Sequence, residues 1–159
     1  MARMLNSSAA VGTASAILGL SKEAWTLGIS LSKLDQNTRL VDTTVRNLAG
    51  EVKSLGNQCD LVYAEVEGGL RRSEAGSPLP HDVDSRMSNC LAIQVEEASR
   101  TMQELELFVV NLTGQEARFI DQAQRQRWLD QSKNQVANIK TRVCRHRDNL
   151  HTTQLLINT

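Results

Sequence analysis

The sequence predicts an all-α protein, an antiparallel up-down four-helix bundle with long helices. Apolar residues recur at alternating steps of three and four along three extended segments, which is the period of a packed helix. Strand-like alternation of comparable length is absent from the sequence, and its two prolines, Pro78 and Pro80, fall in one short cluster. With 159 residues, 40% of them hydrophobic, the chain is predicted to form a single domain spanning 1–159.

The first predicted helix, roughly 8–34, has an unusual composition. From Met4 to Ser21 it carries no charge and is rich in alanine, glycine and serine, and its leucines and isoleucines fall on more than one face. A helix that is hydrophobic around much of its circumference needs either complete burial or lipid. Small residues spaced four apart allow close helix packing in a membrane or in a soluble bundle, and both interpretations stay open. Trp25 is expected in the core, with a bilayer interface as the alternative.

The second predicted helix, roughly 37–70, has the clearest pattern. Asp35 to Thr38 offer side chains that could cap its first turn. At about 1.5 Å per residue it would be about 50 Å long. Its apolar seam is Val41, Val45, Leu48, Val52, Leu55, Cys59, Val62 and Val66.

The third predicted helix, roughly 82–112, follows a loop at 74–81 that contains both prolines. Thr113 and Glu116 have the spacing of a capping box, which predicts a new helix start at this point. The seam of the third helix is Met87, Leu91, Val95, Ala98, Met102, Leu105, Val109 and Leu112.

The fourth predicted helix, roughly 115–156, places a histidine in its seam. His146 is expected to be buried and hydrogen-bonded there, and Trp128 to anchor the start of the helix in the core. Short connections between helices of this length favour an up-down arrangement. The seam is Leu129, Ser132, Val136, Ile139, Val143, His146 and Leu150, closing at Ile157.

Charge is unevenly distributed although 18 basic and 18 acidic residues cancel. Residues 1–50 contain five basic and three acidic residues, for a charge of +2. Residues 51–106 contain five basic and eleven acidic residues, for a charge of −6. Residues 107–159 contain eight basic and four acidic residues, for a charge of +4. The preferred interpretation is that the basic fourth helix lies beside the acidic second and third helices. The alternative is a patch for anionic lipid. Its candidate residues are Lys140, Arg142, Arg145 and Arg147.

Motifs for catalysis are missing from the sequence. It contains no phosphate-binding loop, HExxH, nucleophile elbow or dinucleotide fingerprint, so we expect no enzyme and no metal or cofactor. Zero net charge and five aromatic residues argue against nucleic-acid binding. Three cysteines without CxxC spacing indicate reducing, intracellular conditions, and all three are expected to be buried as small apolar groups.

Three stretches carry a resemblance to a known family. They are the small-residue run at 10–20, the long heptad helix from Arg39, and a closing helix with Arg127-Trp128-Leu129 and the stretch 150–156. In these the chain resembles the HeLo-like N-terminal domains of fungal signalling proteins, including STAND (NLR-like) receptors. The resemblance spans nearly the whole chain, and it implies a bundle related to the one that executes necroptosis.

The resemblance also implies a function. An upstream signal would cluster such domains into a homo-oligomer, and the released N-terminal helix would permeabilise the membrane. The protein would be cytoplasmic and relocate to the plasma membrane, with anionic lipids, an upstream receptor or C-terminal domains of the same protein as partners. The alternative is a non-toxic homotypic or autoinhibitory module of a larger receptor. Separately, the uncapped apolar end at Leu155, Leu156 and Ile157 is consistent with a domain cut from a longer protein. The implied membrane-interacting residues are Val11, Gly12, Ala16, Ile17, Leu18, Gly19 and Leu20.

Overall fold

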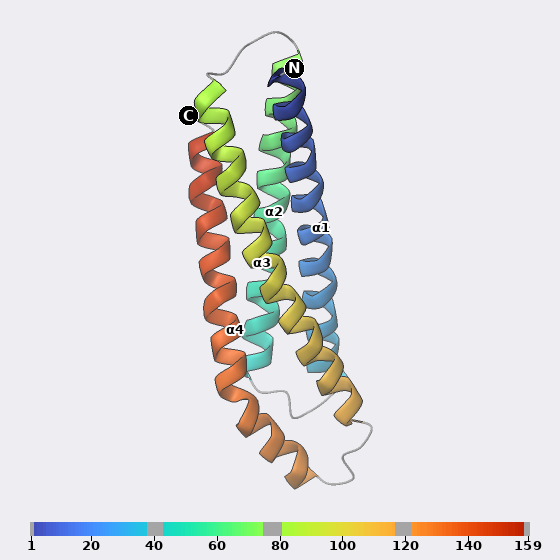
Figure 1. Cartoon of the computed structure of the whole chain (residues 1–159). Helices are drawn as coiled ribbons and strands as arrows, with labels where there is room; N and C mark the ends of the chain where they lie inside the picture. The colour runs from blue at the N-terminus through green and yellow to red at the C-terminus, as the bar shows by residue number, and fades with distance from the viewer. Residues whose placement is uncertain (1, 38–42, 75–80, 117–121, 158–159) are drawn as a thin grey trace.

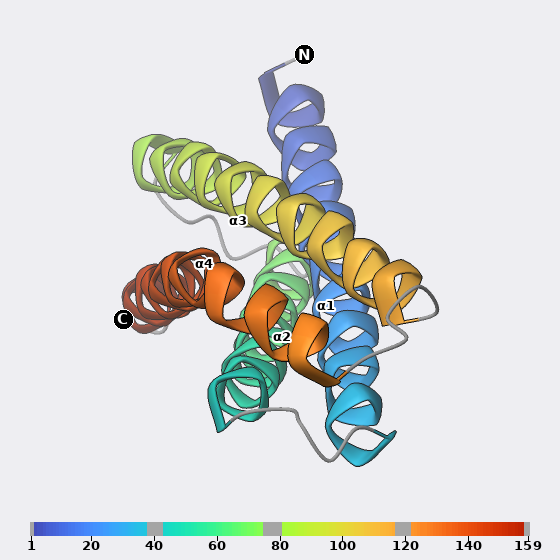
Figure 2. The same ribbon diagram turned by 90° about the horizontal axis from the view of Figure 1, so that it is seen from below.

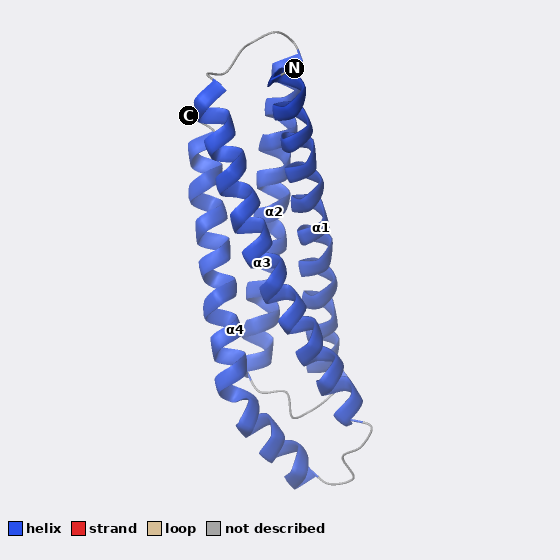
Figure 3. Cartoon of the chain, in the orientation of Figure 1, coloured by secondary structure: helices blue, strands red, loops and turns tan. Residues whose placement is uncertain are grey.

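The protein is a bundle of long helices, as the predicted fold class requires. The computed structural model describes residues 2–37, 43–74, 81–116 and 122–157, and every one of these residues is helical (Figure 3). The helices are α1 (Ala2–Asn37), α2 (Thr43–Glu74), α3 (His81–Glu116) and α4 (Gln122–Ile157), shown in Figure 1.

Successive helices run in opposite directions, which confirms the up-down prediction (Figure 1). Around the bundle the order is α1, α2, α4, α3, so each helix packs against two others. The described parts of α2 and α3 make no close backbone approach to each other, nor do those of α1 and α4, because these pairs lie across the diagonals. Figure 2 shows that α1 and α3 cross at an angle and diverge toward the start of the chain.

The predicted seams of α2, α3 and α4 form the core. Every position of these seams whose side chain is described is buried, apart from Met87, Val66 and Ile157, which are partly buried. Burial of a Leu, Ile or Val side chain contributes roughly 1.5–3 kcal/mol, so this common core is the main source of stability. α1 adds a stripe of its own, consisting of Ile17, Leu20, Ala24, Leu27 and Leu31.

The helix boundaries differ from those predicted. α1 begins six residues before the predicted start and includes Asp35, Gln36 and Asn37, which were expected to cap the second helix. α3 continues through Thr113 to Glu116, so the predicted capping box is not a helix start. Capping side chains are also compatible with a helix interior when the helix is held by packing, and spacing alone does not distinguish the two.

We predict that Leu55→Ala lowers the free energy of unfolding by about 2–5 kcal/mol, because Leu55 is fully buried and truncation leaves a cavity. Leu61→Ala on the same helix is the control, because Leu61 is 45% exposed and its truncation should change the stability by less than about 0.5 kcal/mol. Urea denaturation followed by circular dichroism measures both. Equal losses in the two variants would contradict the core assignment.

Candidate functional site

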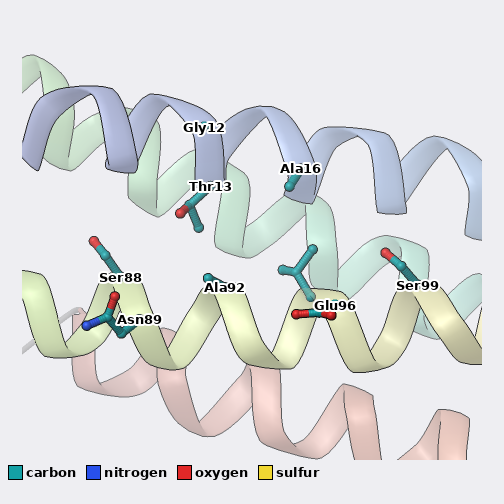
Figure 4. Close-up of a pocket in the computed structure, with 9 residues that line it drawn as sticks. Gly12, Thr13, Ala16, Ser88, Asn89, Ala92, Glu96 and Ser99 are labelled. Atoms are coloured by element: carbon teal, nitrogen blue, oxygen red, sulfur yellow. The ribbon is translucent and has the colours of Figure 1, made fainter. Parts of the chain in front are cut away.

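A groove separates the N-terminal half of α1 from α3 (Figure 4). It has a volume of about 480 Å³, and its α1 wall consists of Gly12, Thr13 and Ala16. The small side chains of this wall leave space between the diverging helices. The α3 wall is formed by Ser88, Asn89, Ala92, Val95, Glu96 and Ser99.

The residues implied to engage membranes occupy three different environments. Ile17 and Leu20 are buried in the core, and Leu18 is half-buried. The Val11 side chain lies outside the described residues. The remaining three, Gly12, Ala16 and Gly19, are exposed. Ile17 and Leu20 are therefore available to lipid only if this part of α1 leaves the bundle.

One carboxylate on α2 binds two side chains of α1. The Ser21 hydroxyl donates a hydrogen bond to Asp60 Oδ1, and Trp25 Nε1 donates one to Asp60 Oδ2 at 3.1 Å. Ser21 Oγ also lies 3.4 Å from the carbonyl oxygen of Gly56. We call Ser21, Trp25, Gly56 and Asp60 the Asp60 clasp. Trp25 is half-buried at this edge of the bundle and is absent from the core, where it was expected.

Two glycines allow α1 and α2 to approach closely beside the clasp. A Cβ atom at Gly56 would lie 2.9 Å from Trp25 Nε1, so the indole ring occupies the space that a side chain would need. A Cβ atom at Gly28 would lie 2.7 Å from Lys53 Cγ. The second half of α1 is therefore closely packed on α2.

One pair of like charges, Glu23 and Glu106, lies between α1 and α3. Burial raises the pKa of the Glu23 carboxyl, and the negative charge of Glu106 on α3 raises it further. At neutral pH this pair opposes the approach of α1 to α3.

Two of the four proposed lipid-binding residues form ion pairs between helices. Arg142 binds both carboxylate oxygens of Glu104 on α3, with Nη1 to Oε1 at 3.0 Å. This hydrogen bonding lowers the pKa of Glu104. Arg147 forms an ion pair with Glu51 on α2. These pairs agree with the preferred interpretation that α4 lies beside α2 and α3.

The four basic residues do not share one face of α4. Arg142 and Arg147 are five residues apart, which is about 140° around the helix, and they contact different helices. Arg145 is exposed between them on the outer surface, and Lys140 is half-buried.

The seam histidine joins α3 to α4 inside the bundle. His146 is buried, and its Nε2 lies 2.8 Å from Thr101 Oγ1, which is a hydrogen-bonding distance. Its predicted seam position and burial are confirmed.

Two further polar pairs lie between helices in this part of the bundle. Gln58 Nε2 donates to Gln154 Oε1 at 2.7 Å, which joins α2 to α4. Thr153 Oγ1 donates to Gln94 Oε1 at 3.1 Å, which joins α4 to α3. Interhelical hydrogen bonds of this kind fix the relative register of the three helices.

The cysteines have different environments, which corrects the expectation that all three are buried. Cys59 is buried, and this burial raises the pKa of its thiol to about 12. Cys144 is half-buried, whereas Cys90 is exposed. The thiol of Cys59 therefore stays protonated at neutral pH and behaves as an apolar group.

Neither a metal site nor a membrane span is found in the described parts of the chain. Among residues 2–37, 43–74, 81–116 and 122–157, no three His, Cys, Asp or Glu side chains gather around a common point. None of the helices, over the residues that are described, combines the length and apolar character needed to cross a bilayer.

Comparison with known proteins finds no match. No protein family, no curated protein and no solved structure is significantly similar to this chain.

The clasp is the feature that the sequence analysis missed. Ser21 and Trp25 are four apart and so share one face of α1, and Asp60 directly follows the seam residue Cys59. That spacing is the available signal. It does not say which helix lies opposite, because the partner is set by the packing order of the bundle.

We predict that acidification destabilises the bundle through His146. Burial lowers the pKa of this imidazole below the ordinary value of 6.5, Glu97 opposes that shift, and Arg142 and Arg145 add to it. The unfolded chain therefore takes up a proton at a higher pH than the folded chain does. Stability is fully present above about pH 6.5 and falls, by at most about 1.4 kcal/mol per pH unit, as the pH is lowered toward the folded-state pKa.

Urea unfolding between pH 7.5 and pH 5 measures this dependence. His146→Gln should flatten it, because glutamine keeps a hydrogen-bonding group near Thr101 but does not titrate. His151→Gln on the exposed side of α4 is the matched control and should keep the wild-type profile. The same profile in wild type and His146→Gln would refute the assignment.

Proposed function

We propose that this chain is a non-enzymatic signalling domain that oligomerises and perturbs membranes through the first half of α1. The observation that carries the proposal is the uneven attachment of α1. Between Met4 and Leu20 the helix carries no charge, and this part borders the open groove. From Ser21 onward the clasp binds the helix to α2.

Release of this segment has a limited energetic cost. Among the described side chains before Ser21, the large apolar ones that it would expose are Ile17 and Leu20, at roughly 1.5–3 kcal/mol each. Insertion into the interfacial region of a bilayer would bury the same apolar surface again. A minor open state that lipid and clustering stabilise is therefore sufficient, with no covalent step.

The resemblance to HeLo-like domains supports the same proposal and extends it. It suggests a fungal STAND-type pathway of programmed cell death, in which a cytoplasmic protein relocates to the plasma membrane when an upstream receptor or C-terminal domains of the same protein cluster it. Within the basic set of α4, exposed Arg145 is the best placed to meet anionic headgroups, because Arg142 and Arg147 are engaged with Glu104 and Glu51.

The clasp favours a second candidate function. A helix fastened to α2 by two side-chain hydrogen bonds and two close glycine contacts is also suited to a bundle that stays closed. In that case the domain would be a non-toxic module for homotypic association or autoinhibition of a larger receptor.

We predict that Ala16→Glu abolishes dye release from phosphatidylserine-containing vesicles while leaving the fold intact. Ala16 is exposed, so a glutamate there does not enter the core, but it places a charge in the segment that is proposed to insert, which opposes insertion. Substitution is preferable to removal of residues 1–20, which would also take Ile17 and Leu20 out of the core.

Ala64→Glu, at an exposed position of α2, is the matched control and should leak like wild type. Vesicle leakage and circular dichroism are measured on all three proteins at the same concentration. A wild-type domain that self-associates in solution but never releases dye would exclude the membrane function and favour the interaction module.

A further inference from the structure

We propose that the Asp60 clasp sets the boundary of the segment of α1 that opens. Residues before Ser21 separate from the bundle, whereas the part of α1 from Ser21 to Leu31 remains on α2. The consequence of this boundary for membranes rests on the proposed function. The opening itself is a property of the isolated domain and can be measured without membranes.

The geometry of the clasp makes it a two-point attachment. Ser21 and Trp25 lie one helical turn apart, and each donates to a different oxygen of the same carboxylate. The Ser21 hydroxyl reaches the Gly56 carbonyl oxygen as well. Hydrogen bonds to an ionised acceptor are stronger than neutral ones, and two of them on one group restrict both translation and rotation of α1 against α2.

Close packing extends the attachment to the C-terminal side of the clasp. The Trp25 ring lies directly against the backbone of Gly56, and Gly28 lies against Lys53. Leu27 and Leu31 are buried in the same stretch. Polar contacts, close backbone approach and core burial therefore coincide from Ser21 onward.

The preceding stretch combines two buried core residues, Ile17 and Leu20, with a face that is exposed or borders the groove. Gly12 and Gly19 are exposed and have no neighbouring atoms within 4 Å of the place where a Cβ atom would lie. On the α3 side this stretch borders the groove, as Figure 4 shows for Gly12, Thr13 and Ala16. A glycine in a helix interior costs about 1 kcal/mol relative to alanine, so Gly12 and Gly19 both weaken the helix before the clasp.

Native-state hydrogen exchange of the complete chain, without membranes, tests the boundary. In wild type we expect residues 12–20 to exchange faster than residues 21–31. Asp60→Asn keeps the shape of the side chain but cannot accept from both donors, and Ser21→Ala removes the hydroxyl donor. Either change should raise exchange across 21–31 by about threefold to tenfold, the range expected for the loss of one partly solvated hydrogen bond to a charged group.

The chain offers matched controls for both substitutions. Ser30→Ala is on the same helix, where the hydroxyl bonds only the Thr26 carbonyl one turn earlier, at 2.9 Å. Asp130→Asn removes a carboxylate from an exposed ion pair with Lys133 within α4. Both should leave exchange in 21–31 at the wild-type rate. The Ser21→Ala/Asp60→Asn double variant should exchange no faster than the faster single variant, because the two groups form one interaction.

Three results would overturn the proposal. The first is equal protection of residues 12–20 and 21–31 in wild type. The second is an unchanged exchange rate of residues 21–31 in both clasp variants. The third is an increase in exchange rate of the same size in all four helices of these variants, which would indicate general destabilisation. Vesicle leakage is measured separately on the same proteins. If exchange follows the clasp and wild type releases no dye, the boundary stands and the membrane function fails. If wild type releases dye but exchange shows no boundary at Ser21, the membrane function stands and the proposed boundary fails.

Discussion

The attachment of α1 to α2 through Asp60 is the interaction on which the behaviour of the first helix depends. In the ring order α1, α2, α4, α3, the described part of α1 has only α2 and α3 as neighbours. On the α3 side, the first half of α1 borders a groove and the second half brings Glu23 toward Glu106. On the α2 side, Ser21 and Trp25 add hydrogen bonds to Asp60 to the core packing of α1, which includes Ile17 and Leu20.

The other helices are joined differently. The C-terminal half of α4 binds both of its neighbours through side-chain pairs, with Arg147 and Gln154 toward α2 and Arg142, His146 and Thr153 toward α3. These contacts cross between elements that are distant in sequence, so they fix register as well as proximity. In the described part of the bundle, α1 is joined to α2 by the Asp60 clasp, and α4 is joined to α2 and α3 by these pairs.

The basic surface of α4 illustrates how packing changes the meaning of a charge pattern. Four cations within eight residues suggest a polyanion site when the sequence is considered alone. In the folded protein, two of these cations neutralise carboxylates of neighbouring helices, on opposite edges of α4. A cation that is already paired gains less from a lipid headgroup, because the existing ion pair has to be broken first. Part of the pattern therefore serves contacts between helices inside the bundle.

The sequence by itself determined the helical class, the up-down alternation and almost every core position of α2, α3 and α4. Those features depend on a periodicity that is local to each segment, as the buried seam from Val45 to Val62 shows. Helix ends were less well determined, since Asp35 and Thr113 have capping chemistry but lie within helices held by packing. Only the tertiary structure decided that α2 and α3 lie on a diagonal, that Trp25 packs on Gly56, and that Asp60 receives Ser21. The physical reason is that each of these depends on which helix stands opposite, and helical periodicity places a residue on a face without specifying the partner of that face.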